Sequence, residues 1–441
     1  MSARIGGAGL AALALLGALC ALCGGAGAAE PAAAGATPAP SPSPATLTLR
    51  LHSQTPSANR SGPLAQAGAL QASLAVDGRP QWLTEVEWQP RLPSLPGALT
   101  LGLNLLAWQG RAGGQVTGSG LRVNELQLSG ELAGWAFNIG KLVVAWDVGQ
   151  GFRPNDLVQQ AQRRKQLDAT LEGRPLLQLE HFGSDQSSSL VWVNPQRLQH
   201  SLADAPGADE SALALRHYRR FGAADGFAFV RHGRHTGSSL GAAGAWVASD
   251  SLALHASLRW LQRHAAWASD GLTAGTLLAA SPWHSTLQGP SRQALLGLTW
   301  TGQARQSLLA EAWYDGSALP PAGWRSWATR NAALTALPAG AAPGAAVAGN
   351  LAWQASPFSA PTLQRQNLLL RAAWQPERWT HSLDLLWQPA DGGLSLTAAT
   401  QWQGERWRLD ASLRRFAGPA GAVLRRLPQR QTLVLAASAN F

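Results

Sequence analysis

The chain has 441 residues and a formal net charge of +10, but only 14% of its residues are Asp, Glu, Lys or Arg. Ordinary soluble proteins carry about a quarter of such residues, so a conventional water-facing surface is excluded. Because 46% of the residues are hydrophobic, disorder of most of the chain is excluded too. No run of about 18 apolar residues follows the N-terminal segment, which excludes membrane-spanning helices. A closed β-barrel is the remaining way to satisfy every backbone polar group inside a bilayer.

Residues 1–28 are typical of a secretory signal peptide. Arg4 precedes an apolar stretch that ends at Cys23, and the small residues that follow predict cleavage after Ala28. An uncleaved anchor helix is the alternative, which the short, Gly/Ala-rich stretch disfavours. Both cysteines, Cys20 and Cys23, lie in this segment. The processed chain is therefore expected to contain neither disulfides nor thiolate metal sites.

A tract rich in Ala, Pro and Ser occupies residues 29–45 and is expected to be a linker. From Thr46 onward, short alternating segments are separated by Gly, Pro, Asp and Asn, which is typical of antiparallel strands. Residues 46–441 show no further break in composition and are expected to form one domain. If each membrane strand of about ten residues is followed by a connection of similar length, this domain is an all-β, transmembrane antiparallel β-barrel of about 16 strands, with about 14 to 18 allowed.

Polar and apolar side chains alternate along this region, which assigns each residue to one face of a strand. In the segment 251–263 one face is apolar and carries Leu252, Leu254, Ala256, Leu258 and Trp260. The opposite face is polar and carries Ser251, His255, Ser257, Arg259 and Arg263. A soluble β-sandwich would alternate in the same way. In a membrane barrel, Leu258→Arg is expected to be costly and Ser257→Arg to cost much less.

The distribution of tryptophan favours the barrel over the sandwich. The chain has 20 Trp but only 2 Tyr, and many of the Trp lie where an apolar face begins or ends, as in the aromatic girdles of membrane barrels. Trp379 and Trp387 bracket Leu383 and Leu385 on one face. The two Trp are about 26 Å apart along an extended strand, which approaches the height of the apolar band of an outer-membrane barrel.

The segment 139–170 combines a strand with a polar insertion. Three residues are expected to face lipid, namely Leu142, Val144 and Trp146. Lys141 and Asp147 are expected on the opposite face. Asp156 is expected to cap a short helix that ends at Gln166 and carries the basic residues Arg163, Arg164 and Lys165. Two alternatives remain open for residues 153–170: a constriction folded into the lumen, or an ordinary exposed loop.

Two segments resemble known families. Gln431–Phe441, with the sequence QTLVLAASANF, is similar to the C-terminal strand of bacterial outer-membrane proteins, which the barrel assembly machinery recognises. Residues 139–195, which begin IGKLVVAWDVGQGFRPNDLVQ and continue through LEGRPLLQLEHF and SSSLVWVNP, resemble a module of porin-like outer-membrane barrels of alginate-export type and related uncharacterised barrels. The resemblance implies a Gram-negative outer-membrane barrel that passes solutes or supports envelope traffic, without identifying the cargo.

Other functional signals are weak. The histidines do not form a compact ligand set with carboxylates, so no metal or cofactor is expected. His255 and Ser257 share a face, as a barrel esterase would require, but so do many inward residues, and no enzymatic activity is expected. Arginines alternate with Leu and Trp behind an export signal, so no nucleic-acid partner is expected despite the positive charge.

Charged residues on the polar faces are the expected lining of a pore. These pore-lining candidates are Arg216, Arg259, Arg365, Arg371, Arg406, Arg408, Arg414, Glu85, Glu87, Lys141 and Asp147. Their arginine excess would raise the local concentration of anions. The function expected is a passive outer-membrane channel for small, mainly anionic or sugar-like solutes, surrounded by outer-membrane lipid. A structural or assembly barrel for envelope polymers and a barrel enzyme are the alternatives.

Overall fold

The computed structural model describes residues 45–96, 98–158, 170–194, 210–270, 277–278, 280–338 and 340–441. The expected signal peptide and all but the last residue of the expected linker lie outside these ranges. So does most of the expected helix at 156–166, including Arg163, Arg164 and Lys165.

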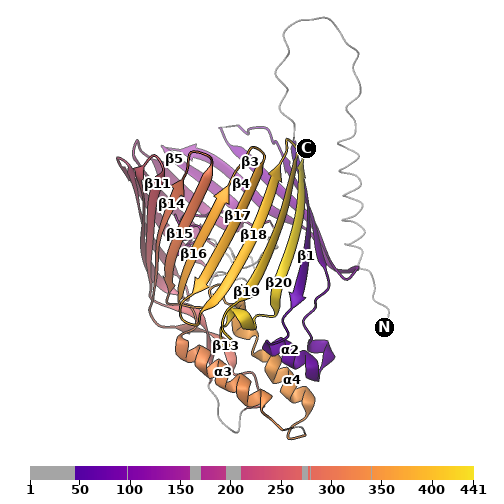
Figure 1. The fold of residues 1–441 in the computed structure, drawn as a ribbon. Coiled ribbons are helices and arrows are strands. Elements are labelled where there is room, and N and C mark those ends of the chain that lie inside the picture. Colours follow the sequence, from indigo (N-terminus) through magenta and orange to yellow (C-terminus); the bar gives the residue numbers. More distant parts are fainter. Residues whose placement is uncertain are drawn as a thin grey trace, which may run out of the picture.

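Eighteen strands form one antiparallel sheet, which closes into a barrel because β1 pairs with both β2 and β20 (Figure 1). The first strands of the sheet are β1 Ala45–Ala58, β2 Gln81–Pro90, β3 Thr100–Ala112, β4 Gln115–Leu132, β5 Trp135–Leu142 and β6 Arg174–Phe182. The next are β7 Gln186–Val193, β8 Ala212–Phe221, β9 Ala224–Gly233, β10 Gly237–Ser249, β11 Leu252–Leu261 and β14 Ser291–Thr301. The last are β15 Gln306–Asp315, β16 Gln366–Trp374, β17 Trp379–Gln388, β18 Gly393–Gln403, β19 Trp407–Ala417 and β20 Gln429–Asn440.

The predicted fold class is confirmed, and 18 strands is the upper bound of the predicted range. The central expectation of about 16 strands was low because it gave every strand an equally long connection. Several connections are far shorter, such as residues 133–134, 222–223 and 250–251, which leaves chain for one more hairpin.

The two ends of the barrel differ in the length of their connections. At the end where β1 begins and β20 ends, here called the turn end, the longest connection comprises residues 91–99. At the other end, here called the loop end, connections include residues 59–80, 143–173, 262–290 and 316–365. Figure 1 shows the helices beyond the loop end, on the side of the barrel opposite the C-terminus.

The outer face of the barrel is apolar and the inner face is polar, as the alternation predicts. On β11 the side chains of Leu258 and Trp260 are 59% and 38% exposed, whereas those of Ser257 and Arg259 are buried. The register continues this division around the sheet, because Leu254 lies opposite Leu298 of β14. Exposed tryptophans lie near both rims of the outer face, including Trp82, Trp192, Trp260 and Trp387 at the loop end and Trp135, Trp246, Trp300, Trp374, Trp379 and Trp407 at the turn end.

The long connections at the loop end build a cap with its own apolar core. Its elements are α2 Pro63–Leu70, η1 Ala72–Leu74, the hairpin β12 His264–Ser269 and β13 Trp283–Gln288, α3 Pro321–Thr335, α4 Gly344–Trp353, η2 Ser356–Ser359 and η3 Leu424–Arg426. Trp324 and Trp327 of α3 pack with Trp283 and Phe358 in one buried cluster. Proline in the first turn of α2 and α3 suits a helix start, where no N–H bond is lost. No helix in the described ranges is long and apolar enough to cross a membrane.

Candidate functional site

Residues 143–158, here called the lumen segment, leave the sheet after β5 and lie inside the barrel. The ring of Phe152 stacks on Trp313 of β15 with a centroid distance of 5.8 Å. The side-chain amide of Asn155 donates to the hydroxyl oxygen of Ser257 on β11 at 2.8 Å. Because these partners are on the inner faces of strands remote from β5, the segment crosses the interior rather than following the rim.

One anchor of the lumen segment is a carboxylate on β15. Glu311, which is 2% exposed, accepts hydrogen bonds from the backbone N–H groups of Gln150 at 2.7 Å and Gly151 at 2.6 Å. Its Oε1 also lies 2.9 Å from Nε2 of His255 on β11. A Cβ atom on Gly151 would lie 2.7 Å from Oε2 of Glu311, so a side chain at this position would push the carboxylate away from the backbone N–H groups that it binds.

A second anchor joins the segment to β11. Asp147 accepts hydrogen bonds from the Asn155 backbone N–H at 2.6 Å and from the Ser257 hydroxyl at 2.9 Å. The Arg259 guanidinium donates to the carbonyl oxygen of Pro154 at 2.7 Å. Burial raises the pKa of the Asp147 carboxyl, and the hydrogen bonds from Asn155 and Ser257 oppose this shift. The pore-lining candidates Asp147 and Arg259 are thus brought together, as supports of the lumen segment.

Asp156 lies inside this arrangement and is not the cap of a helix at its own position. Its Oδ1 accepts hydrogen bonds from the backbone N–H groups of Trp146 at 2.9 Å and Asp147 at 3.1 Å. The carboxylate therefore ties the two ends of the lumen segment together. The expected helix start at Asp156 was wrong for the described residues, because the backbone groups that the carboxylate serves precede it in the chain.

An apolar cluster holds the other side of the lumen segment, and it corrects the expected lipid contact of Val144 and Trp146. These side chains are 9% and 7% exposed and pack with Leu157 and Val158 in a buried cluster. The cluster also contains inner-face residues of β6 to β9, namely Leu176, Val191, Val193, Ala214 and Phe229. Leu142, the last residue of β5, packs against the same cluster, so its expected lipid contact was wrong as well. The alternation at 142–146 reflects burial inside the barrel, because the inner wall is locally apolar there.

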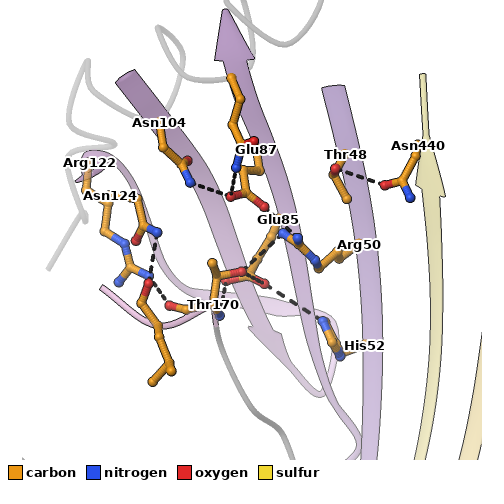
Figure 2. A network of polar contacts seen from close by, with 12 residues as sticks. Thr48, Arg50, His52, Glu85, Glu87, Asn104, Arg122, Asn124, Thr170 and Asn440 are labelled. Carbon is orange, nitrogen blue, oxygen red and sulfur yellow. Dashed lines mark hydrogen bonds and ion pairs between the residues drawn. The ribbon is translucent and has the colours of Figure 1, made fainter. Parts of the chain in front are cut away.

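A polar network covers the inner wall at β1 to β3 (Figure 2). Glu85 and Glu87 of β2 are 1% and 5% exposed. Glu87 forms an ion pair with Arg50 of β1 at 2.5 Å and accepts a hydrogen bond from Asn104 of β3. Glu85 accepts hydrogen bonds from the backbone N–H and the hydroxyl of Thr170 at 3.2 and 3.1 Å, and lies 3.8 Å from His52.

The same network binds the chain where it returns to the barrel wall. Arg122 of β4 donates to the carbonyl oxygen of Thr170 at 2.6 Å, and Figure 2 shows both beside Asn124. Lys141 forms an ion pair with Glu172, and Arg122 lies 3.6 Å from the same carboxylate. The pore-lining candidates Glu85, Glu87 and Lys141 therefore belong to one interconnected region on β1 to β5.

The remaining arginine candidates lie elsewhere on the wall. Arg371 of β16 lies 3.6 Å from Asp384 of β17, and Arg408 pairs with Asp410 along β19 at 2.9 Å. Three more candidates lie at or near the inner face: Arg414 donates to Thr397 at 3.0 Å, Arg216 lies over the ring of Phe227 at 5.1 Å, and Arg365 donates to the carbonyl oxygen of Ala318 at 3.1 Å.

Arg406 is a candidate that the structure places outside the inner wall. It is exposed in the connection between β18 and β19 at the turn end. The strand begins at Trp407, one residue later than the alternation suggested, so the residue before it belongs to the turn.

Several residues of the site were missed by the analysis of the sequence. Arg50 and His52 alternate with Leu49 and Leu51, and this pattern was sufficient to place them inside. Glu172 and Asn155 carry no such signal, because their partners are remote in the sequence and the segments that contain them are not strands. No group of three or more potential His, Cys, Asp or Glu metal ligands occurs within the described ranges.

Comparisons with known proteins show the type of fold. No protein-family model matches the chain, and no curated protein matches it. OccK11 (OpdR) of Pseudomonas aeruginosa is 12% identical, with a TM-score of 0.51 over 90% of this chain and 95% of that one. OccK8 (OprE) of the same organism is 10% identical, with a TM-score of 0.51 over 90% and 97%. A Rhodopseudomonas blastica porin variant is 9% identical, with a TM-score of 0.42 over 90% and 99%.

The chain therefore has the fold of a porin-like antiparallel β-barrel. This confirms the broad resemblance to porin-like barrels. The solved structures do not single out the alginate-export type, which stays a prediction.

Proposed function

We propose that the chain is a passive outer-membrane channel for small, mainly anionic or sugar-like solutes, with the lumen segment as its constriction. The observation that carries the proposal is the seating of this segment inside the barrel on Glu311 and Ser257. A segment that only closed a rim would not need hydrogen bonds to strands on the far side of the interior. Long loops on the outside and short turns toward the periplasm are the rule in such barrels, which places the loop end outside the cell.

The solute path follows the part of the wall that carries charged and amide side chains. The contacts described above attach the lumen segment to β6–β9, β11 and β15. Arg371, Arg408 and Arg414 lie on β16 and β19, beyond these contacts, and Arg50 lies on β1. Such a wall supplies donors for anions and a mixture of donors and acceptors for sugar hydroxyls.

A barrel without an open pore, which serves envelope structure or assembly, is the second candidate. The cap favours it, because Trp283, Trp324 and Trp327 form a packed core beyond the loop end. The enzyme alternative loses its main sequence signal, since His255 faces Glu311 and Ser257 binds Asp147. Both side chains support the lumen segment.

Current recordings in planar bilayers test the channel. The wild-type protein is expected to give stable conductance steps. The double variant Asp147→Ala/Glu311→Ala is expected to give larger and noisier steps. It removes the acceptors for three hydrogen bonds between the segment and the wall and for one within the segment.

Asp410→Ala on β19 is the matched control, because it removes an inner-wall carboxylate that does not contact the lumen segment in the contacts described above. It is expected to keep the wild-type step size. Conductance in the double variant alone would support the closed barrel, and no conductance in any of the folded proteins would contradict the channel.

A further inference from the structure

The outer face of the barrel carries an apolar groove of about 640 Å³ that runs across β11 and β14 to β18. Ala310 and Ala312 of β15 line it, with leucines on the strands to either side. In the register Ala312 lies between Leu296 of β14 and Leu368 of β16, and Leu296 is 66% exposed. The groove is therefore a hollow, bordered by leucine side chains, in the surface that faces lipid.

A cationic side chain and two aromatic rings lie on the same outer face at the loop end. Arg292 is opposite Trp260, and Tyr314 is opposite Ala294, in the strand register. Arg292 and Leu296 are about 13 Å apart along β14. The Arg292 guanidinium is exposed, and within the described ranges it has no ion-pair partner.

We propose that this groove is a binding site for an anionic, phosphate-bearing lipid. An acyl chain lies between the leucines, where its burial is favourable, and the phosphate lies on the planar guanidinium of Arg292, which binds phosphate with two parallel hydrogen bonds. Trp260 and Tyr314 suit the boundary between hydrocarbon and headgroups. The placement of the site in the outer leaflet rests on the orientation of the barrel proposed above.

The barrel contains an internal control for this combination of groove and charge. Arg111 of β3 is opposite Trp82 of β2 on the outer face at the loop end, so it repeats the pairing of Arg292 with Trp260. The outward residue Ala107 lies on the same strand, opposite Val86. Neither Arg111 nor Ala107 borders the groove, so substitutions there measure the effect of charge or bulk alone.

The test measures lipid retained by the folded full-length protein after extraction from vesicles, by native mass spectrometry. The vesicles consist of phosphatidylcholine doped with either lipopolysaccharide or phosphatidylglycerol. Arg292→Glu and Ala312→Trp are each expected to reduce retention about fivefold or more, on the scale of one charge contact at a membrane surface. Arg292→Lys is expected to restore part of it, and Arg111→Glu and Ala107→Trp to leave it unchanged.

The two dopants distinguish the sources of the phosphate. Retention of lipopolysaccharide alone assigns the site to that glycolipid, and retention of both assigns it to phosphate-bearing lipids in general. Equal losses in the control variants, or retention that is insensitive to Arg292→Glu, would overturn the proposal. So would a change from oligomer to monomer in Ala312→Trp with lipid retention unchanged, because the groove would then bind a second copy of the chain.

Discussion

Several of the charged pore-lining candidates have a partner of opposite sign. Glu87 lies against Arg50, and Lys141 against Glu172. Arg371 approaches Asp384. Opposite charges at such distances largely cancel each other's field beyond the pair. The proposed preference of the lumen for anions therefore depends on the arginines in excess over carboxylates, and we expect it to be smaller than the count of arginines in the sequence suggests.

Removing the arginines beside Asp384 is expected to move ion selectivity toward cations. Arg371→Gln/Arg414→Gln leaves the carboxylate of Asp384 without its neighbouring cations on the inner wall. Glu85→Gln/Glu87→Gln is expected to move selectivity toward anions. The reversal potential under a salt gradient measures both shifts, which should weaken as the Debye length falls from about 30 Å at 0.01 M salt to about 3 Å at 1 M.

Arg406→Gln is the control for charge outside the lumen, since this residue is exposed in a turn, and it should leave the reversal potential unchanged. Parallel shifts in both double variants would contradict the assignment of these residues to a conducting wall.

A charged side chain on the outer face is expected to destabilise the barrel. Leu258→Arg, at a residue that is 59% exposed on the outer face, is expected to lower the free energy of unfolding by about 2 to 4 kcal/mol if the site is near the bilayer midplane. Ser382→Arg is the better inner-face comparison, because Ser382 lies between Ala373 and Ala399 in the register. Urea titration of the protein in vesicles measures both.

Ser257→Arg is unsuitable as the mild substitution that the sequence suggested. Ser257 is 1% exposed and lies between Asp147 and Asn155, so a long side chain there displaces the lumen segment. Equal losses for Leu258→Arg and Ser382→Arg would contradict the assignment of faces.

At the level of elements, the lumen segment depends on glycine. A Cβ atom on Gly151 would lie 2.6 Å from Leu369 Cδ2 as well as close to Glu311. Gly151→Ala is expected to cost about 1 to 3 kcal/mol of stability, as overpacking does, and to increase current noise by loosening the segment. Gly349→Ala in α4 is the matched control, because no atom in the described ranges other than its chain neighbours and the adjacent backbone of its own helix lies within 4 Å of its Cβ position. If Gly151→Ala changes neither the stability nor the current noise, the lumen segment tolerates displacement.

Glu210 joins two connections at the loop end and makes their stability depend on pH. Burial opposes its ionisation, but the Thr236 hydroxyl, the charge of Arg231 and the backbone N–H groups of His235 and Thr236 outweigh burial and lower the pKa of Glu210 below its usual value of 4.5. A carboxyl whose pKa is lowered in the folded state stabilises that state at pH values above the pKa of the unfolded chain. This contribution is lost as the pH falls through the pKa of the folded state.

Glu210→Gln should therefore unfold more easily than the wild type at neutral pH, by about 1 to 3 kcal/mol for the loss of charged hydrogen bonds. The difference should disappear in acid, below the lowered pKa. Urea titrations at several pH values measure it, and a difference that does not change with pH would place the effect in packing rather than in charge.

The alternation of polar and apolar residues was sufficient to predict the strands and their faces, because successive side chains in a strand point to opposite faces of the sheet. It predicted the outward Leu258 and the inward Glu85 correctly. It was wrong at Trp146, because a segment buried inside a barrel shows the same local pattern as a lipid-facing strand. It also missed the cap, whose α3 contains Trp324 and Trp327. Those tryptophans are buried by η2 and β13, which are distant in the sequence and leave no local signal.

Across the whole molecule, the two ends of the barrel differ in what their connections build. The turn end needs only short connections, whereas the loop end carries both the cap and the connection that enters the lumen. A solute that crosses the barrel therefore passes the level of the cap and the level of the lumen segment. A proteolytic cut in the cap that changes conductance would show that the cap limits the path.

The seam between β1 and β20 makes the order of assembly a physical problem. The side-chain hydrogen bond from Thr48 to Asn440 joins residues that are 392 positions apart. β1 is therefore translated long before β20, its neighbour at the seam. Until then, a partial barrel in hydrocarbon would expose two edges of unpaired N–H and C=O groups, each costing several kcal/mol. Insertion before β1 and β20 have paired is therefore costly unless the free edge of β1 is shielded from hydrocarbon.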